Sequence, residues 1–208
     1  MQLTQQIKIK PDKWQKDLLW KLSEKCRLIY NFALDERKES FKNNISGITY
    51  LKQQNDLPKI KEKYPGYGWV YSKVLQHTLR MLDSNYKSFF TLLKKGKEAK
   101  LPRFMGKKYF TTMFHNQSGF KHEKGFIELA HKHPSKIRLK FKIPDKFSFE
   151  KIYQVAVYNK DNEFYLSIIY EKREKNYEDN SLYQAFDLGV MKHTAVNSNG
   201  KFVEFVNQ

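Results

Sequence analysis

Hydrophobic residues recur at two different spacings along this chain. Up to about residue 94 they return mainly at steps of three and four, which predicts helices. From about residue 109 they alternate with polar residues, which predicts strands. A short alternating stretch, LTQQIKIK, comes before the helices and ends at Pro11. We therefore expect a leading strand, a helical part and a β-rich part, which together make an α+β protein.

The helical part contains two strongly patterned helices. The first follows Pro11 and the second runs from about Val70 to Leu93, with a weaker helical segment and the turn KYPGYGW between them. We expect the two apolar faces to pack as core, with lysines and Arg27 on the outer face of the first helix. The predicted core residues are Trp14, Leu18, Leu22, Cys26, Ile29 and Ala33 in the first helix, and Val74, Leu75, Thr78, Leu82, Tyr86, Phe89 and Leu93 in the second.

The β-rich part reads as a series of short strands. VYNKDNEFYL has two alternating runs around a polar loop, which indicates a hairpin. Several short strands in a basic chain suggest a small barrel of the oligonucleotide-binding type. REKNYEDNS, at residues 173–181, is predicted to be a linker, and SLYQAFDLGV after it a buried strand. The other expected strands are YFTTMF, GFIELA, KIRLKFKI, QVAVYN, EFYLSIIYEK, HTAVNS and KFVEFV.

Charge narrows the class of partner. The 208 residues carry a formal net charge of +17, which suggests a polyanion and, first of all, nucleic acid. No apolar run reaches the roughly 18 residues of a membrane helix, so no membrane partner is expected. The single cysteine, Cys26, excludes an intramolecular disulfide and suits a reducing compartment. Without a signal-peptide pattern at the start, we expect a cytoplasmic protein.

Four histidines are candidate ligands for a metal site. His115, His122, His131 and His133 lie near one another in sequence, but no pair of cysteines stands nearby to complete a zinc site. We interpret them as exposed histidines in basic turns and expect no zinc. No phosphate-binding loop, dinucleotide fingerprint or serine nucleophile motif is present.

Two basic segments favour nucleic-acid contact. Between Lys94 and Lys108 the chain has seven basic residues and one acid, interspersed with aromatic side chains, which suits phosphate contact and base stacking. The predicted strand KIRLKFKI places only cations on one face, and we favour nucleic-acid contact there over a plain solvated face. These cations are Lys136, Arg138, Lys140 and Lys142.

Asp187 stands in an apolar setting, Ala185 to Val190, on a predicted strand. A carboxylate in such a setting is costly unless it binds something. A two-metal nuclease would use it, but it needs several converging carboxylates. Only Glu204 follows, so these two do not make a complete site.

Taken together, four segments resemble the amino-terminal half of the TnpB family of RNA-guided nucleases from bacterial and archaeal insertion sequences: CRLIYNFALDER, VLQHTLRMLDSNYKSFF, KLPRFMGKK and FDLGVMKHTAVNSNGKF. The resemblance implies a multi-domain α+β chain: a wedge-type oligonucleotide-binding β-barrel with an inserted helical recognition lobe, followed by the first β-hairpin of a RuvC (RNase H-like) domain. The implied boundaries are 1–10 for the first barrel strand, 11–100 for the lobe, 101–175 for the barrel, and 176–208 for the linker and the incomplete RuvC-like part.

The resemblance also implies residue roles. Asp187 takes the position of the first catalytic, metal-binding acid. Ser72, Lys73 and Gln76 fall where the lobe faces the DNA motif beside the target, although polar residues on the open face of a core helix would look the same. Arg103, Lys107 and Lys108 are implied to face RNA phosphates, and Arg138 and Lys140 are further candidates for that role.

The chain departs from the family pattern, because it lacks the two later acidic motifs and the four-cysteine zinc ribbon. We therefore expect a guide-RNA- and target-DNA-binding portion of an RNA-guided DNA endonuclease that is inactive unless complemented. Its partner would be a carboxy-terminal nuclease half, with Mg²⁺ bound only in the completed site. Two alternatives stay open: a nuclease-dead RNA-guided DNA-binding repressor, and a DNA-binding accessory of transposition without a guide.

Overall fold

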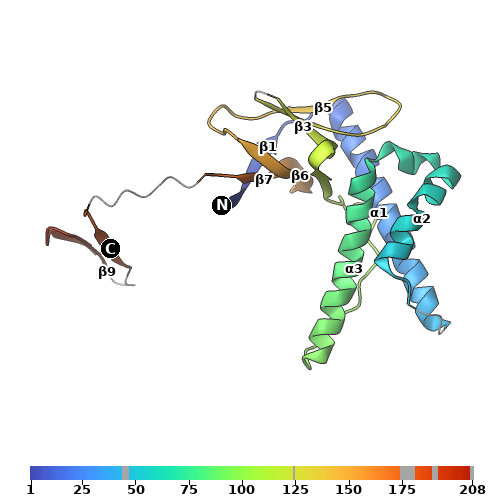
Figure 1. The fold of residues 1–208 in the computed structure, drawn as a ribbon, viewed down its shortest axis with the longest axis horizontal. Coiled ribbons are helices and arrows are strands. Elements are labelled where there is room, and N and C mark those ends of the chain that lie inside the picture. The colour runs from blue at the N-terminus through green and yellow to red at the C-terminus, as the bar shows by residue number, and fades with distance from the viewer. Residues whose placement is uncertain (44–46, 124, 174–180, 189–191, 207–208) are drawn as a thin grey trace. The chain divides into compact units, whose positions relative to one another are not determined.

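The chain divides into two compact units, Met1–Lys172 and Arg173–Gln208. The computed structural model describes residues 1–43, 47–123, 125–173, 181–188 and 192–206. The first unit combines three helices with the strands β1–β7, and the second contains β8–β10 (Figure 1). The protein is therefore mixed helix and sheet.

Three helices follow the first strand: α1 (Lys13–Lys42), α2 (Tyr50–Lys63) and α3 (Ser72–Lys94). The predicted start of α1 after Pro11 is confirmed, and the cap explains it. The Asp12 side chain accepts a hydrogen bond from the Gln15 N–H at 2.8 Å, and the Gln15 side chain accepts one from the Asp12 N–H at 3.2 Å. This capping box satisfies two N–H groups of the first turn.

The predicted stripes of α1 and α3 form the helical core over most of their length, and α1 packs against α3. Cys26 is fully buried there, and burial raises the pKa of its thiol to about 12. The two outermost predictions are wrong: Trp14 is 66% exposed and Leu93 is 47% exposed. Both lie outside the stretches that carry the buried residues, Leu18 to Ser40 in α1 and Val74 to Leu82 in α3.

Two antiparallel sheets make up the rest of the first unit. The four-stranded sheet has the order β1-β7-β6-β2, and the three-stranded sheet has the order β3-β4-β5. Among the described strands, these pairings leave the sheets open and close no barrel. The strands are β1 (Gln2–Ile9), β2 (Met113–Asn116), β3 (Phe120–Glu123), β4 (Phe126–Leu129), β5 (Leu139–Lys142), β6 (Lys151–Lys160) and β7 (Glu163–Glu171).

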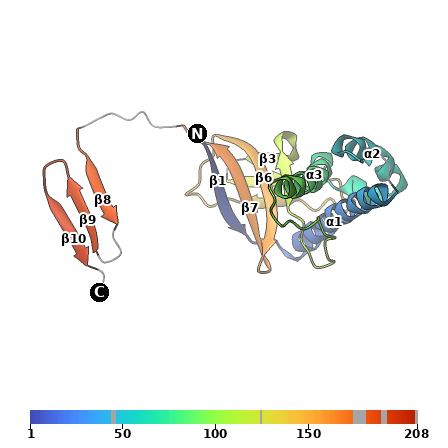
Figure 2. The same cartoon turned by 90° about the horizontal axis from the view of Figure 1, so that it is seen from below.

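The four-stranded sheet joins distant parts of the chain. β1 pairs with β7 from Gln2↔Glu171 to Ile9↔Phe164, so the first strand closes onto the last strand of the unit (Figure 2). The predicted hairpin is confirmed as β6–β7. Its turn residues Asp161 and Asn162 have φ of 52° and 62°, as the favoured two-residue hairpin turn requires.

The second unit is a three-stranded antiparallel sheet of β8 (Gln184–Leu188), β9 (Lys192–Asn197) and β10 (Phe202–Val206). The three predicted strands are confirmed, but the expected burial of the first is wrong: Phe186 is 64% exposed, and Asp187 is exposed too. The described residues of this unit form one sheet layer, which cannot bury a face. Residues 174–180 of the predicted linker (173–181) and Gly189 of the FDLG motif lie outside the described residues.

Candidate nucleic-acid interface

The first turn of α3 carries the side chains that were predicted to face DNA. Ser72 and Lys73 are exposed and Gln76 is half-buried. The helix has no side-chain cap at Tyr71, so its first N–H groups lack that partner. The hydroxyl of Ser72 accepts a hydrogen bond from Lys61 Nζ of α2 at 2.7 Å. This turn therefore presents positive charge at a helix N-terminus that has no side-chain cap.

A second lysine, Lys132, adds positive charge in the surroundings of Lys61: its backbone N–H donates a hydrogen bond to the carbonyl of Trp69, in the turn that follows α2, at 2.8 Å. Burial, and then the charge of Lys132, lower the pKa of Lys61 from its ordinary value. No carboxylate in the described part of the chain forms an ion pair with Lys61 or Lys132. Two neighbouring cations without a counter-charge favour the binding of an anion, because the anion relieves their repulsion.

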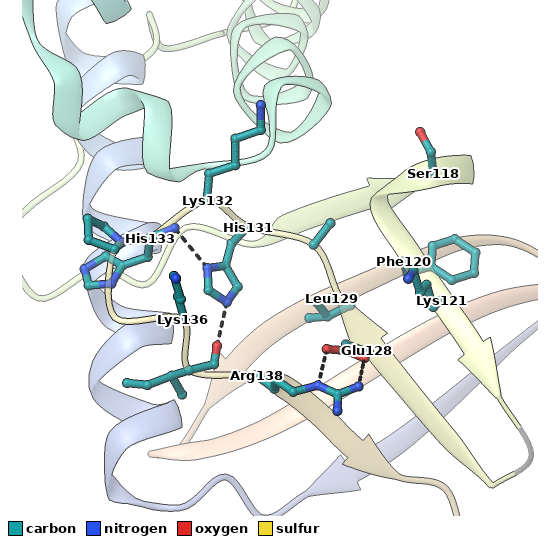
Figure 3. Close-up of a pocket in the computed structure, with 13 residues that line it drawn as sticks. Ser118, Phe120, Lys121, Glu128, Leu129, His131, Lys132, His133, Lys136 and Arg138 are labelled. Atoms are coloured by element: carbon teal, nitrogen blue, oxygen red, sulfur yellow. Dashed lines mark hydrogen bonds and ion pairs between the residues drawn. The ribbon is translucent and has the colours of Figure 1, made fainter.

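Lys132 belongs to a loop, residues 131–138, that borders a cavity of about 520 Å³ (Figure 3). We call this space the 131–138 cavity. Its other walls come from β3, β4 and the residues just before β3. Apolar and basic side chains line it together, among them Phe120, Leu129, Ile137, Lys121, Lys132, Lys136 and Arg138.

The loop is fixed by His131. The Nε2 atom of His131 lies 2.7 Å from the Ile137 carbonyl oxygen, and its Nδ1 accepts a hydrogen bond from the His133 N–H at 3.1 Å. Nε2 is therefore the protonated ring nitrogen, and it donates the hydrogen bond to the Ile137 carbonyl. Both ring nitrogens are occupied, so this histidine is a structural residue, half-buried instead of exposed as predicted. The described residues contain no group of three or more His, Cys, Asp or Glu that could hold a metal ion.

His115 was predicted to be exposed, but it is buried, and its Nδ1 has no hydrogen-bond partner among the described residues. Its ring stacks on that of Tyr71, at 6.4 Å between centroids, and the Tyr71 hydroxyl lies 2.8 Å from Ser118 Oγ at the cavity wall. Burial lowers the pKa of His115 to about 4. These contacts connect the cavity to Tyr71 and hence to the start of α3.

The predicted alternation of KIRLKFKI is confirmed by burial, because its four cations are more exposed than the apolar residues between them, but the strand is shorter than expected and its outer face is not purely cationic. The regular strand covers only Leu139–Lys142. Arg138 makes two hydrogen bonds to Glu128, at 2.7 and 2.6 Å, and Lys140 lies 2.9 Å from Glu123. Glu128 comes from β4, which pairs with β5, and Glu123 comes from β3 on the far side of β4. Half of the expected cations are therefore compensated, which weakens the charge argument for Arg138 and Lys140 as phosphate contacts.

The third predicted group, Arg103, Lys107 and Lys108, is exposed in the segment between α3 and β2. No described carboxylate forms an ion pair with any of the three. The segment is fixed to α1 through Met105, whose carbonyl accepts hydrogen bonds from Arg27 at 3.0 Å and Asn31 at 2.9 Å.

Arg27 was predicted on the outer face of the first helix, but it is buried. Its guanidinium binds Glu24 at 2.6 Å and holds the pKa of that carboxyl below its ordinary value. Ser23, four residues before Arg27, accepts a hydrogen bond from the Thr111 N–H at 2.7 Å. Ser23, Arg27 and Asn31 thus form a polar stripe at four-residue spacing, a signal that was present in the sequence and missed.

The structure brings two of the three predicted groups to the same cavity. Tyr71, which precedes Ser72, lies with its hydroxyl 2.8 Å from Ser118 Oγ, and Ser118 and Arg138 both line the 131–138 cavity. The Arg103 group lies against Arg27 and Asn31, and no described contact connects it to the other two. Sequence reasoning named Lys136 but missed Lys61 and Lys132. Lys132 was missed because His131 and His133 on either side of it were considered only as candidate metal ligands.

In the second unit, Asp187 pairs with Thr194 of β9, and Glu204 of β10 pairs with the same Thr194. The three residues therefore form one row across the sheet and share a face. Glu204 is held by Lys192 at 2.8 Å. Two carboxylates, one of them compensated by a lysine, do not supply the converging set that a two-metal centre needs.

Comparison with known families gives a match at the start of the chain. Residues 1–46 match the family HTH_OrfB_IS605, described as a helix-turn-helix domain. The match suggests a DNA-binding, transposon-associated function and supports an amino terminus of the OrfB/IS605 type. Within residues 1–43 the structure has β1 and the single helix α1, and no second helix. No curated protein matches the chain, and no described helix is both long and apolar enough to cross a membrane.

Proposed function

We propose that this chain is the guide-RNA- and target-DNA-binding portion of a TnpB-like RNA-guided DNA endonuclease in the cytoplasm of a prokaryote. One observation carries the proposal: three lysines, Lys121, Lys132 and Lys136, line one cavity within a chain of net charge +17. Such a surface suits a polyanion with many phosphates. The OrfB/IS605-type match at residues 1–46 supports the same assignment.

In this proposal the protein contacts backbone and shape, while guide–target pairing reads the sequence. Ser72, Lys73 and Gln76 are placed toward the DNA motif beside the target, where Gln suits adenine and Lys suits guanine or phosphate. Arg103, Lys107 and Lys108 are assigned to RNA phosphates, because they are exposed and form no ion pair with a carboxylate among the described residues. The helical lobe and the wedge-type barrel are part of the same proposal.

Asp187 is proposed as one carboxylate ligand of a Mg²⁺ site in a RuvC-like domain. The row Asp187–Thr194–Glu204 does not fit a metal centre by itself, so further carboxylates must come from a carboxy-terminal nuclease half. We therefore assign no cleavage step to the described residues. If no such half assembles, the chain acts as a nuclease-dead DNA-binding repressor.

The nucleic acid that copurifies with the chain tests the main proposal. We expect one defined, structured RNA on sequencing. A chain that retains only DNA would instead be the guide-free accessory of transposition, the candidate favoured by the helix-turn-helix description of the matching family. Recovery of no nucleic acid at low salt would contradict both.

Complementation tests the role of Asp187. The chain, its RNA and a separately expressed polypeptide carrying later acidic motifs are mixed with Mg²⁺ and target DNA. We expect guided cleavage that Asp187→Ala abolishes and that Asp145→Ala, an exposed control in the first unit, preserves. Cleavage that survives Asp187→Ala would exclude Asp187 from the site, and guided binding without any cleavage would indicate the repressor.

A further inference from the structure

We propose that the 131–138 cavity binds one unpaired nucleotide of a single strand, with its base stacked on the guanidinium of Arg138 and its phosphate held by Lys132 and Lys136. The inference rests on the proposed nucleic-acid-binding function and adds a specific subsite to it. Its volume of about 520 Å³ falls within the range of roughly 300–1,000 Å³ that is typical of small-ligand pockets.

The lining suits a nucleotide better than a free inorganic anion. Leu129 is buried at the cavity wall, and Phe120 and Ile137 are half-buried there. These apolar groups offer contact to a base, while the lysines offer contact to a phosphate. A simple anion site would need only the charged groups.

Arg138 supplies a flat surface held in place. Its two hydrogen bonds to Glu128 fix the plane of the guanidinium along one edge (Figure 3). The Arg138 side chain remains 64% exposed, whereas that of Glu128 is 22% exposed, so a face of the guanidinium is accessible. An Arg plane of this kind stacks on unstacked bases. The ion pair that weakens Arg138 as a phosphate contact therefore preorganises it as a stacking surface.

The backbone conformation of Lys136 is an independent observation that favours a binding site here. Its φ of 55° lies in the left-handed region, which is uncommon for residues other than glycine. The loop holds it there through the Lys136 N–H, which donates to the His133 carbonyl at 3.2 Å, and through the His131–Ile137 hydrogen bond. Strain that surrounding contacts maintain is found preferentially at binding sites.

Lys132 lies at the opposite rim. Figure 3 shows its side chain extending from the loop toward the helices, and its charge acts on Lys61. A phosphate at Lys132 would also offset the repulsion between the charges of Lys132 and Lys61, and Lys61 binds Ser72 of α3. A strand that places one base in the cavity would thus have its backbone directed toward the start of α3.

The test uses the whole chain and two octamers in which every base is 5-iodouracil, one of RNA and one of DNA. Affinity is measured by fluorescence anisotropy, and photocrosslinks are mapped by mass spectrometry. We expect crosslinks within residues 117–138. Arg138→Lys, which keeps the charge but not the plane, should lower their yield about fivefold, in line with one stacked base.

Variants at the rim separate the phosphate role from the base role. Lys132→Ala with Lys136→Ala should weaken affinity about tenfold through lost phosphate contacts, whereas Lys160→Ala, an exposed lysine at the end of β6 that does not line the cavity, should change neither readout. Crosslinks from only one octamer would identify RNA or DNA as the source of the nucleotide.

Binding with crosslinks only outside residues 117–138, or a yield unchanged by Arg138→Lys, overturns the subsite and leaves the proposed function intact. Binding of neither octamer overturns the proposed function as well. The melting temperature of each variant is compared with that of the unsubstituted chain, so that loss of fold is not read as loss of the site.

Discussion

Asn31 and Met105 exchange two hydrogen bonds: the Met105 N–H donates to Asn31 Oδ1 at 2.8 Å, and Asn31 Nδ2 donates to the Met105 carbonyl at 2.9 Å. The side-chain amide of Asn31 thereby bonds both backbone groups of Met105, as a neighbouring strand would, although the segment between α3 and β2 is not in a sheet. Arg27 donates to the same carbonyl. The basic residues on either side of Met105 are thus presented from a fixed backbone.

Asn31→Ala removes both bonds and leaves a half-buried backbone N–H of Met105 without its partner. We expect a loss of about 1–3 kcal/mol in the free energy of unfolding, measured by urea denaturation, and faster tryptic cleavage after Lys107 or Lys108. Asn55→Ala, at an exposed position of α2, serves as the control. Equal cleavage rates in the two variants would show that the segment is held by other contacts.

Lys107→Ala combined with Lys108→Ala should flatten the salt dependence of RNA binding. Each lost phosphate contact reduces the slope of log K against log salt by about 0.7 to 0.9, so a reduction of up to about 2 is expected in titrations from 50 to 300 mM salt. The matched control is Lys42→Ala, whose ammonium pairs with Glu39 at 2.7 Å. An unchanged slope would remove these two lysines from the interface.

Gly119→Ala tests the packing that links the cavity to α3. A Cβ at this position would lie 2.8 Å from Cε1 of the Tyr71 ring, which is held by its stacking on His115 and its contact with Ser118. We expect a destabilisation of about 1–3 kcal/mol, read as a lower urea midpoint. Gly68→Ala, where a Cβ meets nothing within 4 Å, should have a urea midpoint close to that of the unsubstituted chain. Equal midpoints for the two would mean that Tyr71 can move away at little cost.

Stability should fall in mild acid because of His115. Its folded pKa of about 4 lies below the ordinary 6.5, so the unfolded chain binds more protons between these values and stability decreases as pH falls through that window. This one group accounts for about 2 kcal/mol between pH 7 and pH 5. His131, its titratable neighbour, is held by two hydrogen bonds and lowers the pKa further.

The comparison is made between variants by urea denaturation at pH 7 and pH 5. His115→Phe and His115→Leu should lose about 2 kcal/mol less than the unsubstituted chain over this interval. His122→Gln, an exposed histidine, should behave like the unsubstituted chain. If the two His115 variants show the full acid sensitivity, protonation of this ring is not its cause.

The local pattern of hydrophobic and polar residues was sufficient to predict most of the helices and strands. The alternation before Pro11, the stripe from Leu18 to Ala33 and the hairpin around Asp161 each depend on neighbours within a few residues, and each is confirmed. β3 was not predicted, since FKHE is too short and polar to show alternation.

Which basic side chains are free and which are compensated could not be predicted from the sequence, because their partners lie in distant parts of the chain. Glu128 and Glu123 neutralise Arg138 and Lys140 only through the pairing of β3, β4 and β5. Arg27 appears as one more surface cation until Met105, 78 residues later, accepts its hydrogen bond. The 131–138 cavity depends on loop backbone fixed by His131, which has no periodic signature.

The pairing of β1 with β7 also has a consequence for synthesis on the ribosome. Ile9 emerges 155 positions before its partner Phe164, which at about 5–20 residues per second corresponds to roughly ten to thirty seconds. During that interval the alternating strand β1 has an unpaired edge, while α1 and α3 can already associate. The lysines at positions 8 and 10 place positive charge at this unpaired strand edge, and such charge disfavours pairing with a strand of a neighbouring nascent chain.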